Sequence, residues 1–240
     1  GRFELLNSPA AHAAAREAVR KSLVLLKNDG VLPIRSSARV FVTGPGADNL
    51  PMQCGGWSLT WQTSDTSNAD FPAGESIRAA FERTLKSSGG RLVDGSDLLG
   101  ADRPEVAVVV YGEQPYAENH GDVKLAIYND REMLEQLWQL RKAGIPTVSI
   151  VLSGRPLWMN PEIDASNAFV AAWLPGTEGG GLADALIGDA MGHARFNFSG
   201  RLSFHWPKDL DPPGTGHANK ERGAIWPLGY GLSYAMPASP

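Results

Sequence analysis

The 240-residue sequence has a single cysteine, few histidines and no excess of positive charge. Cys54 therefore cannot form an internal disulfide, and metal sites built from several thiolates are excluded. Two glycines follow Cys54 and no histidine partner is evident, which favours a packed thiol over a nucleophile. A single cysteine does not indicate whether the protein resides in an oxidising or a reducing compartment.

Several functional classes are excluded by composition and spacing. The net charge of -4 argues against a nucleic-acid surface, which needs clustered Lys and Arg. No apolar stretch approaches the roughly 20 residues that cross a bilayer, so no membrane partner is expected. His193, His205 and His217 lack the spacing of metal ligands and are predicted to be structural, with no metal bound.

What is present is typical of a globular α/β domain, with 42% hydrophobic and 20% charged residues. Apolar runs without alternation predict strands buried on both faces, and their alternation with amphipathic segments predicts a parallel, doubly wound sheet. The segment from residue 201 onward is rich in Pro, Gly and aromatic residues, and we expect an irregular tail with room for one further strand. The predicted helices cover residues 10–28, 75–87, 130–142 and 181–187, and the predicted strands cover 40–43, 106–111, 147–152 and 168–174.

The glycines and serines that follow these strands do not match two common site motifs. Gly44-Pro45-Gly46 lacks the third glycine of a dinucleotide fingerprint, because position 49 is Asn49. Ser153 is not a nucleophile elbow, since Val151 stands where that motif needs glycine. A flavodoxin-like nucleotide-binding domain is disfavoured on the same glycine pattern.

The stretch YGEQPYAENHGD, residues 111–122, begins at a predicted strand end, where parallel sheets bind ligands. Its acids could be solvated surface groups, but Tyr116 and His120 flank Glu118 and could donate hydrogen bonds to it. Partial burial by these aromatics would raise the carboxyl pKa, as a general acid requires. Glu113, nearest the strand, is expected to make structural hydrogen bonds, and Glu118 is expected to reach a ligand.

Two tryptophans lie in the segment GGWSLTWQ, residues 55–62, whose flanks are poor in apolar residues. Each could fill a core, but an indole on a loop suits the apolar face of a sugar ring. Glycoside hydrolysis generally needs two carboxylates, one to protonate the leaving oxygen and one to attack the anomeric carbon. No second carboxylate stands out, because three aspartates lie in predicted loops without distinguishing context: Asp48, Asp65 and Asp94.

Seven segments together resemble the second domain of glycoside hydrolase family 3, the β-glucosidase and exo-β-glucanase group. Any one of them is a weak signal, but all occur in the family's order. They are AREAVRKSLVLLKNDGVLPI (15–34), GGWSLTWQ (55–62), GEQPYAENHGD (112–122), SGRPLWMNP (153–161), AAWLPGTEGGGLADALIGD (171–189), FSGRLSFHWP (198–207) and PLGYGLSY (227–234).

The resemblance implies a three-layer sandwich in which helices cover both faces of a mostly parallel six-stranded sheet. It implies that Glu118 is the general acid/base, that Trp61 is one wall of an aromatic clamp around a sugar, and that Trp57 shapes the loop. The family's nucleophile is an aspartate on a preceding (β/α)8 barrel domain that these residues do not include. Residues 1–9 would then be a remnant of the linker, residues 10–240 the sandwich domain, and the abrupt start at Gly1 would reflect a longer chain.

The function implied is to supply the acid/base to a retaining, exo-acting β-glucosidase or exo-1,3/1,4-β-glucanase. Its substrates would be β-glucosides and β-glucan oligosaccharides, its partner the barrel domain, and no cofactor would be needed. The alternative is a non-catalytic carbohydrate-binding or interaction module that uses Trp57 and Trp61 and leaves Glu118 idle.

Overall fold

The computed structural model describes residues 7–210 and 223–235, and its centre is a six-stranded sheet. The strand order is β1-β6-β5-β4-β2-β3, in which β1 pairs antiparallel with β6 and the other pairs are parallel. The predicted fold class, an α/β sandwich with a mostly parallel six-stranded sheet, is confirmed. The strands are β1 (Val24–Asn28), β2 (Arg39–Thr43), β3 (Arg91–Leu92), β4 (Val106–Gly112), β5 (Thr147–Leu152) and β6 (Ala168–Trp173).

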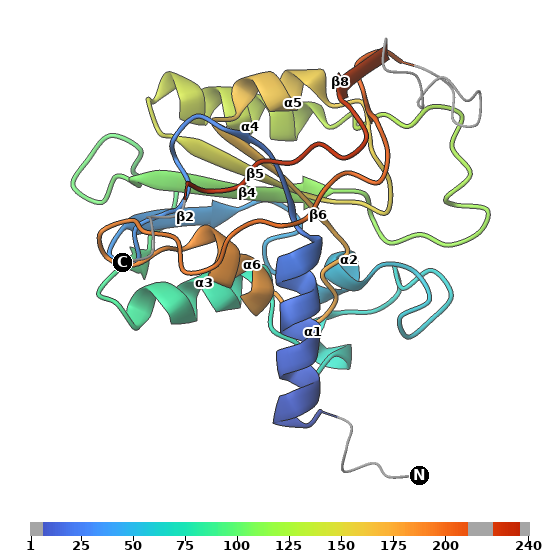
Figure 1. Cartoon of the computed structure of the whole chain (residues 1–240), viewed down its shortest axis with the longest axis horizontal. Coiled ribbons are helices and arrows are strands. Elements are labelled where there is room, and N and C mark those ends of the chain that lie inside the picture. Colours follow the sequence, from blue (N-terminus) through green and yellow to red (C-terminus); the bar gives the residue numbers. More distant parts are fainter. Residues whose placement is uncertain (1–6, 211–222, 236–240) are drawn as a thin grey trace.

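Helices cover both faces of this sheet, as Figure 1 shows. On one face lie α1 (Pro9–Ser22), α2 (Leu50–Cys54), α3 (Ile77–Lys86) and α6 (Gly180–Leu186), and on the other lie α4 (Arg131–Lys142) and α5 (Asn160–Ala165). Each layer encloses its own core. Phe81 and Leu182 belong to the first core, whereas Leu137 and Ile163 belong to the second.

The tail after the sheet forms a small separate pairing. The two-residue strand β7 (Trp206–Pro207) pairs antiparallel with β8 (Ala224–Trp226), and Trp206 packs edge-on against Phe169 of β6. The tail therefore holds two short strands where one was expected, and both lie outside the main sheet. The short 3-10 turn Asn68–Asp70 completes the regular elements of the described residues.

The prediction of one helix over residues 10–28 was wrong in its last third, residues 23–28. Ser8 caps the start of the helix, because its Oγ accepts from the Ala11 backbone N–H at 3.2 Å, but the helix ends at Ser22. Residues 24–28 form β1 instead, and Leu23 to Leu26 are fully buried. A short apolar run is compatible both with the buried face of a helix and with a buried strand. Here the pairing with β6 makes it a strand.

Parallel strands β4 and β5 end side by side, which brings their following loops together at one edge of the sheet. Gly112 permits this close approach, since a Cβ there would lie 1.9 Å from the Leu152 carbonyl oxygen. No helix in the described part of the chain is both long and apolar enough to cross a bilayer. Residues 1–6 of the expected linker and the histidine at position 217 lie outside the described residues.

Candidate active site

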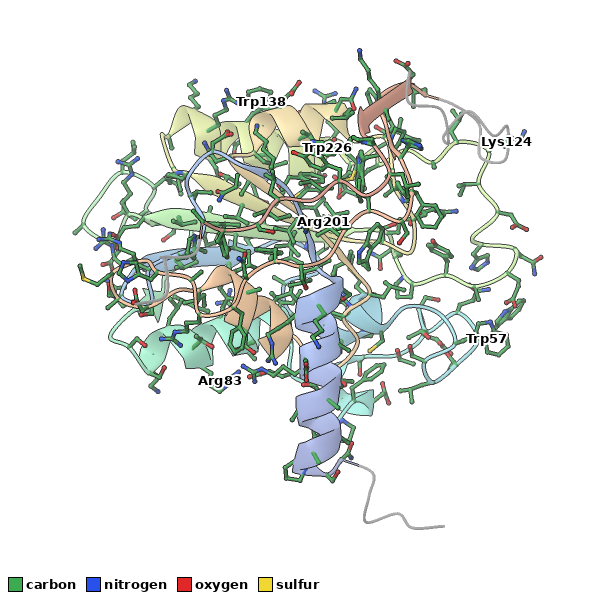
Figure 2. All side chains as sticks on the ribbon, in the orientation of Figure 1. Trp57, Arg83, Lys124, Trp138, Arg201 and Trp226 are labelled. Atoms are coloured by element: carbon green, nitrogen blue, oxygen red, sulfur yellow. The ribbon has the colours of Figure 1, made fainter. Side chains whose placement is uncertain are left out.

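Two loops meet at the carboxyl edge of the sheet. We call residues 113–122, which follow β4, the acid loop, and residues 55–66, which follow α2, the tryptophan loop. Their main chains approach closely, because a Cβ on Gly56 would lie only 2.1 Å from the carbonyl oxygen of Tyr116. Figure 2 shows Trp57 at the outer end of its loop, on the same side of the molecule as Lys124, which follows the acid loop. Glycine at position 56 thus lets the two loops form one site.

Glu118 of the acid loop is held by both tryptophans. The indole Nε1–H groups of Trp57 and Trp61 donate to the same carboxylate oxygen, Oε2, at 3.0 and 2.7 Å. The pKa of Glu118 is lowered from its ordinary value, first by the Trp61 hydrogen bond, then by the backbone N–H of Glu118 and by Trp57. Hydrogen bonds to the anion favour the charged form, so the exposed carboxylate of this chain is held ionised.

This geometry corrects two expectations about Glu118. The donors are the indoles of the other loop, and within the described acid loop no hydrogen bond joins the Glu118 side chain to Tyr116 or His120. The Tyr116 ring instead faces the guanidinium of Arg155, whose Cζ lies 4.5 Å from the ring centroid. The pKa of Glu118 is also lowered rather than raised, because the side chain is exposed and the aromatic partners donate N–H groups instead of removing water.

Glu113 has the structural role that the sequence predicted. Its carboxylate accepts from Nε and Nη2 of Arg155, at 3.0 and 2.5 Å, and from Ser153 Oγ at 2.6 Å. Arg155 also donates Nη1–H to the Gly121 carbonyl at 2.8 Å. Arg155 therefore holds both ends of the acid loop against the end of β5. Sequence reasoning missed it, because the ion pair joins residues 42 positions apart.

The two indoles are exposed to solvent, as a sugar-binding platform requires. Trp57 is 67% exposed and Trp61 46% exposed, with ring centroids 6.5 Å apart and planes tilted by 47°. A backbone hydrogen bond of 3.0 Å from Trp57 N–H to the Trp61 carbonyl closes the turn between them. Trp57 has a φ of 62°, a left-handed conformation that costs a non-glycine residue free energy and is often found at functional sites.

Beside the two loops lies an open cleft of about 260 Å³. The cleft is lined by the residues that directly follow β4, β5 and β6 and by the base of the tryptophan loop. Its walls mix apolar and polar side chains, which suits a sugar better than a purely apolar ligand. Among the lining residues are Met52, Gly56, Glu113, Gln114, Tyr116 and Leu174.

No second carboxylate joins Glu118 in the described residues. The three aspartates considered from sequence are engaged locally, Asp48 with Asn68, Asp65 with Thr60 and Asp94 with Ser96. None of them shares a hydrogen-bond partner with Glu118. The described residues also contain no group of three or more His, Cys, Asp or Glu side chains that could hold a metal ion.

The remaining reactive side chains are structural where the structure describes them. Half-buried Cys54 has its pKa raised to about 11 by burial, so the thiol stays protonated. His193 Nδ1 lies 3.0 Å from Asp189 Oδ2, and His205 Nδ1 accepts from the Leu228 backbone N–H at 3.2 Å. Cys54 is thus partly buried, and His193 and His205 each have a hydrogen-bond partner within the described residues.

Comparison with known proteins settles the relationship. Residues 23–234 match the glycosyl hydrolase family 3 C-terminal domain. The chain belongs to this family. The exo-1,3/1,4-β-glucanase of a Pseudoalteromonas species is 45% identical over 96% of this family 3 chain, with a TM-score of 0.88. The lysosomal β-glucosidase of Dictyostelium discoideum is 33% identical over 92% of it.

The fold is also shared at lower sequence identity. A β-glucosidase from Listeria innocua superimposes with a TM-score of 0.72 at 23% identity. The chain spans only 29% of the length of both the Pseudoalteromonas and the Dictyostelium proteins. The similarity therefore concerns one part of those enzymes, and it relates this domain to exo-β-glucanases and β-glucosidases.

Proposed function

We propose that this domain supplies Glu118 as the acid/base of a retaining, exo-acting β-glucosidase or exo-1,3/1,4-β-glucanase, with Trp61 as a sugar-binding indole. The observation that carries the proposal is the pair of indole N–H bonds to Glu118 on an exposed loop. Glu118 and Trp61 occupy the acid/base and clamp positions that the family resemblance assigned. The relatives' names, an exo-1,3/1,4-β-glucanase and a β-glucosidase, support the substrate class.

The nucleophile would come from a (β/α)8 barrel domain, on the same polypeptide or on an assembled partner. In the first step the barrel carboxylate attacks the anomeric carbon while Glu118 protonates the departing glycosidic oxygen. In the second step Glu118 removes a proton from water as that water attacks the glycosyl-enzyme. Glu118 thus donates one proton and recovers one in each turnover, so no cofactor is required.

Because the pKa of Glu118 is lowered in this chain, the mechanism also requires the barrel domain to dock on the two loops. An ionised carboxylate can act as the base of the second step, but the first step needs its protonated form. A barrel that covers the loops would remove water from Glu118, and desolvation raises a carboxyl pKa. A nearby barrel carboxylate would raise it further. The same side chain could then alternate between acid and base.

Glu118→Gln in an enzyme that combines this domain with its barrel tests the proposal. We expect kcat on a natural β-glucan to fall about 10²- to 10⁴-fold, the range that one positioned acid/base contributes. Aryl glucosides with highly acidic leaving phenols should lose far less in the first step, since their departure needs no proton. Full activity of Glu118→Gln on a natural glucan would reject the assignment.

The exposure of Trp57 and Trp61 also favours the second candidate, a carbohydrate-binding module. Calorimetric titration of laminari- and cello-oligosaccharides into the isolated chain separates the two functions. A half-site should bind them weakly or not at all, and the chain alone should not hydrolyse an aryl β-glucoside. Tight binding by the isolated chain would support the module. Turnover by the pure chain would contradict the proposal that the nucleophile comes from the barrel domain.

A further inference from the structure

Gln62, the residue after Trp61, bridges the two loops with both ends of its carboxamide. Its Nε2–H donates to the Glu118 carbonyl oxygen at 3.0 Å, and its Oε1 accepts from the Ala117 backbone N–H at 2.6 Å. The side chain thus pairs with the main chain on either side of the acid/base candidate, much as a neighbouring strand would. A glutamine supplies the donor and the acceptor from one half-buried planar group.

The acid loop has few other restraints near Glu118. Its main chain bonds to the sheet at Glu113, whose N–H donates to the Leu152 carbonyl at 2.9 Å. Further along, the backbone bonds within the loop are local, from Gly121 N–H to the Ala117 carbonyl at 2.8 Å and from Asp122 N–H to Asn119 at 3.4 Å. Arg155 holds the Gly121 end, and the indoles hold the Glu118 side chain. Among the described residues, the hydrogen bonds that join the main chain of residues 117 and 118 to another loop come from Gln62.

We propose that Gln62 is a positioning residue, which fixes the main chain of Ala117 and Glu118 so that the Glu118 carboxylate meets both indole N–H groups. This inference deepens the proposed function and rests on it for its catalytic consequence. The geometric part stands alone, because Gln62 and Trp61 are adjacent in one loop. The tryptophan loop, which carries both indoles, therefore also fixes the position and orientation of the Glu118 carboxylate.

A positioning role matters because proton transfer depends on distance. A displacement of about 1 Å caused by a change away from the reacting atoms can cost roughly 10²-fold in rate. Without the two Gln62 hydrogen bonds, residues 117–120 keep only their local turn bonds, and Asn119 is already in a left-handed conformation with a φ of 74°. We expect Glu118 then to sample positions that lose one or both indole donors.

The first test uses NMR on this chain and needs no activity. In Gln62→Ala, hydrogen exchange of the Ala117 amide should accelerate roughly 2- to 10-fold, as loss of one hydrogen bond predicts. The pKa of Glu118, followed through its side-chain ¹³Cδ shift, should rise toward the ordinary value. Gln139→Ala, at an exposed position of α4, is the matched control and should change neither; Figure 2 shows the adjacent Trp138 far from Trp57.

A second variant keeps the test decisive if Gln62→Ala fails to fold. Gln62→Glu retains an acceptor for the Ala117 N–H but loses the donor to the Glu118 carbonyl, so it should protect Ala117 while still altering the Glu118 titration. Unchanged exchange at Ala117 together with an unchanged Glu118 titration in the folded Gln62→Ala variant would overturn the proposal.

The second test uses the enzyme assembled with its barrel and separates this inference from the proposed function. Gln62→Ala should lower kcat on the order of 10- to 100-fold with a smaller change in KM, and Gln139→Ala should leave both unchanged. If Glu118→Gln keeps full activity, the proposed function fails, while the NMR result still decides the role of Gln62. If Glu118→Gln is inactive but Gln62→Ala keeps its kcat, the positioning role in catalysis is wrong.

Discussion

At the scale of single residues, the chemistry depends on one oxygen, Oε2 of Glu118, which accepts from Trp57 and Trp61. The indoles that we propose as sugar-binding faces therefore also favour the charged form of the carboxylate beside them. Because both donors favour the anion, the chain alone holds Glu118 in the state that accepts a proton. A sugar or a domain that displaces either indole would change both binding and proton affinity.

Removing the donors one at a time should reveal their unequal contributions. Trp61→Phe and Trp57→Phe keep an aromatic face but lose the N–H, so both should raise the pKa of Glu118. The effect should be larger for Trp61, whose bond is 2.7 Å long, than for Trp57 at 3.0 Å. A ¹³Cδ titration of Glu118 measures both shifts, and Trp138→Phe on α4 serves as the control. A pKa unchanged in Trp61→Phe would contradict this account of the site.

From the sequence, the places of Glu118 and Glu113 in the acid loop could be predicted better than their hydrogen-bond partners. Glu118 and Glu113 could be separated because one lies in mid-loop and the other at a strand end. The donors to Glu118 could not be found in the same way, because Tyr116 and His120 are its neighbours along the chain, whereas Trp57 and Trp61 reach it from another loop. Gln62 and Arg155 were missed for the same reason, since only the folded chain brings their contacts together.

At the scale of elements, the loops of the site follow β4, β5 and α2. The helix α1 is held on the same domain by ion pairs with α6. Asp184 of α6 accepts from Arg16 Nε and Nη2, at 2.7 and 2.6 Å, and from Arg20 Nη1 at 2.7 Å. This bidentate pair and its second arginine join α1 to α6, and the Asp184 side chain is only 15% exposed. Such partly buried, charge-assisted bonds contribute more than surface pairs.

Asp184→Ala should therefore loosen α1 and lower the free energy of unfolding by about 2 kcal/mol, because two arginines lose their shared acceptor. Urea denaturation followed by circular dichroism measures the change. Glu17→Ala, which removes the exposed pair with Lys21 on the same helix, should leave the midpoint unchanged. Equal effects of the two substitutions would contradict the special role of Asp184.

Helices and strands with clear periodicity were predicted within one or two residues, including β5 at residues 147–152 and α4. The short elements α2, α5 and β3 were not predicted. β1 was predicted as helix, because the apolar run at residues 23–26 follows a good helix without a glycine or proline to mark the change. Its pairing partner, β6, lies more than a hundred residues later in the sequence. A propensity argument sees only the local run, whereas pairing and burial decide the outcome.

At the scale of the whole molecule, the sheet separates two cores, and the one under α4 and α5 encloses a carboxyl group. Glu162 is 3% exposed, and burial, together with the nearby charge of Asp130, raises its pKa to about 7. Its Oε2 has no hydrogen-bond partner among the described residues. Ionisation of Glu162 is therefore less favourable in the folded state than in the unfolded chain, where water solvates the carboxylate.

The sign of the pH dependence follows from this raised pKa. The folded state binds the Glu162 proton more tightly than the unfolded state does. The stabilisation from this protonated carboxyl is therefore complete below the ordinary pKa of 4.5 and is lost as the pH rises through about 7. Relative to Glu162→Gln, the wild type should lose on the order of 2–3 kcal/mol between pH 5 and pH 8. Denaturant melts of both proteins at each pH check this, and a difference that does not vary with pH would contradict it.

The most direct measurement concerns the central claim that this domain donates the proton and another domain donates the nucleophile. An enzyme that joins this chain to its barrel, carrying Glu118→Gln, is supplied with an activated aryl β-glucoside and sodium azide, and the products are followed by ¹H NMR. We predict that azide restores turnover and forms the β-glucosyl azide, because a small anion needs no base to attack the glycosyl-enzyme. Absence of rescue, or an α-configured azide, would contradict the account.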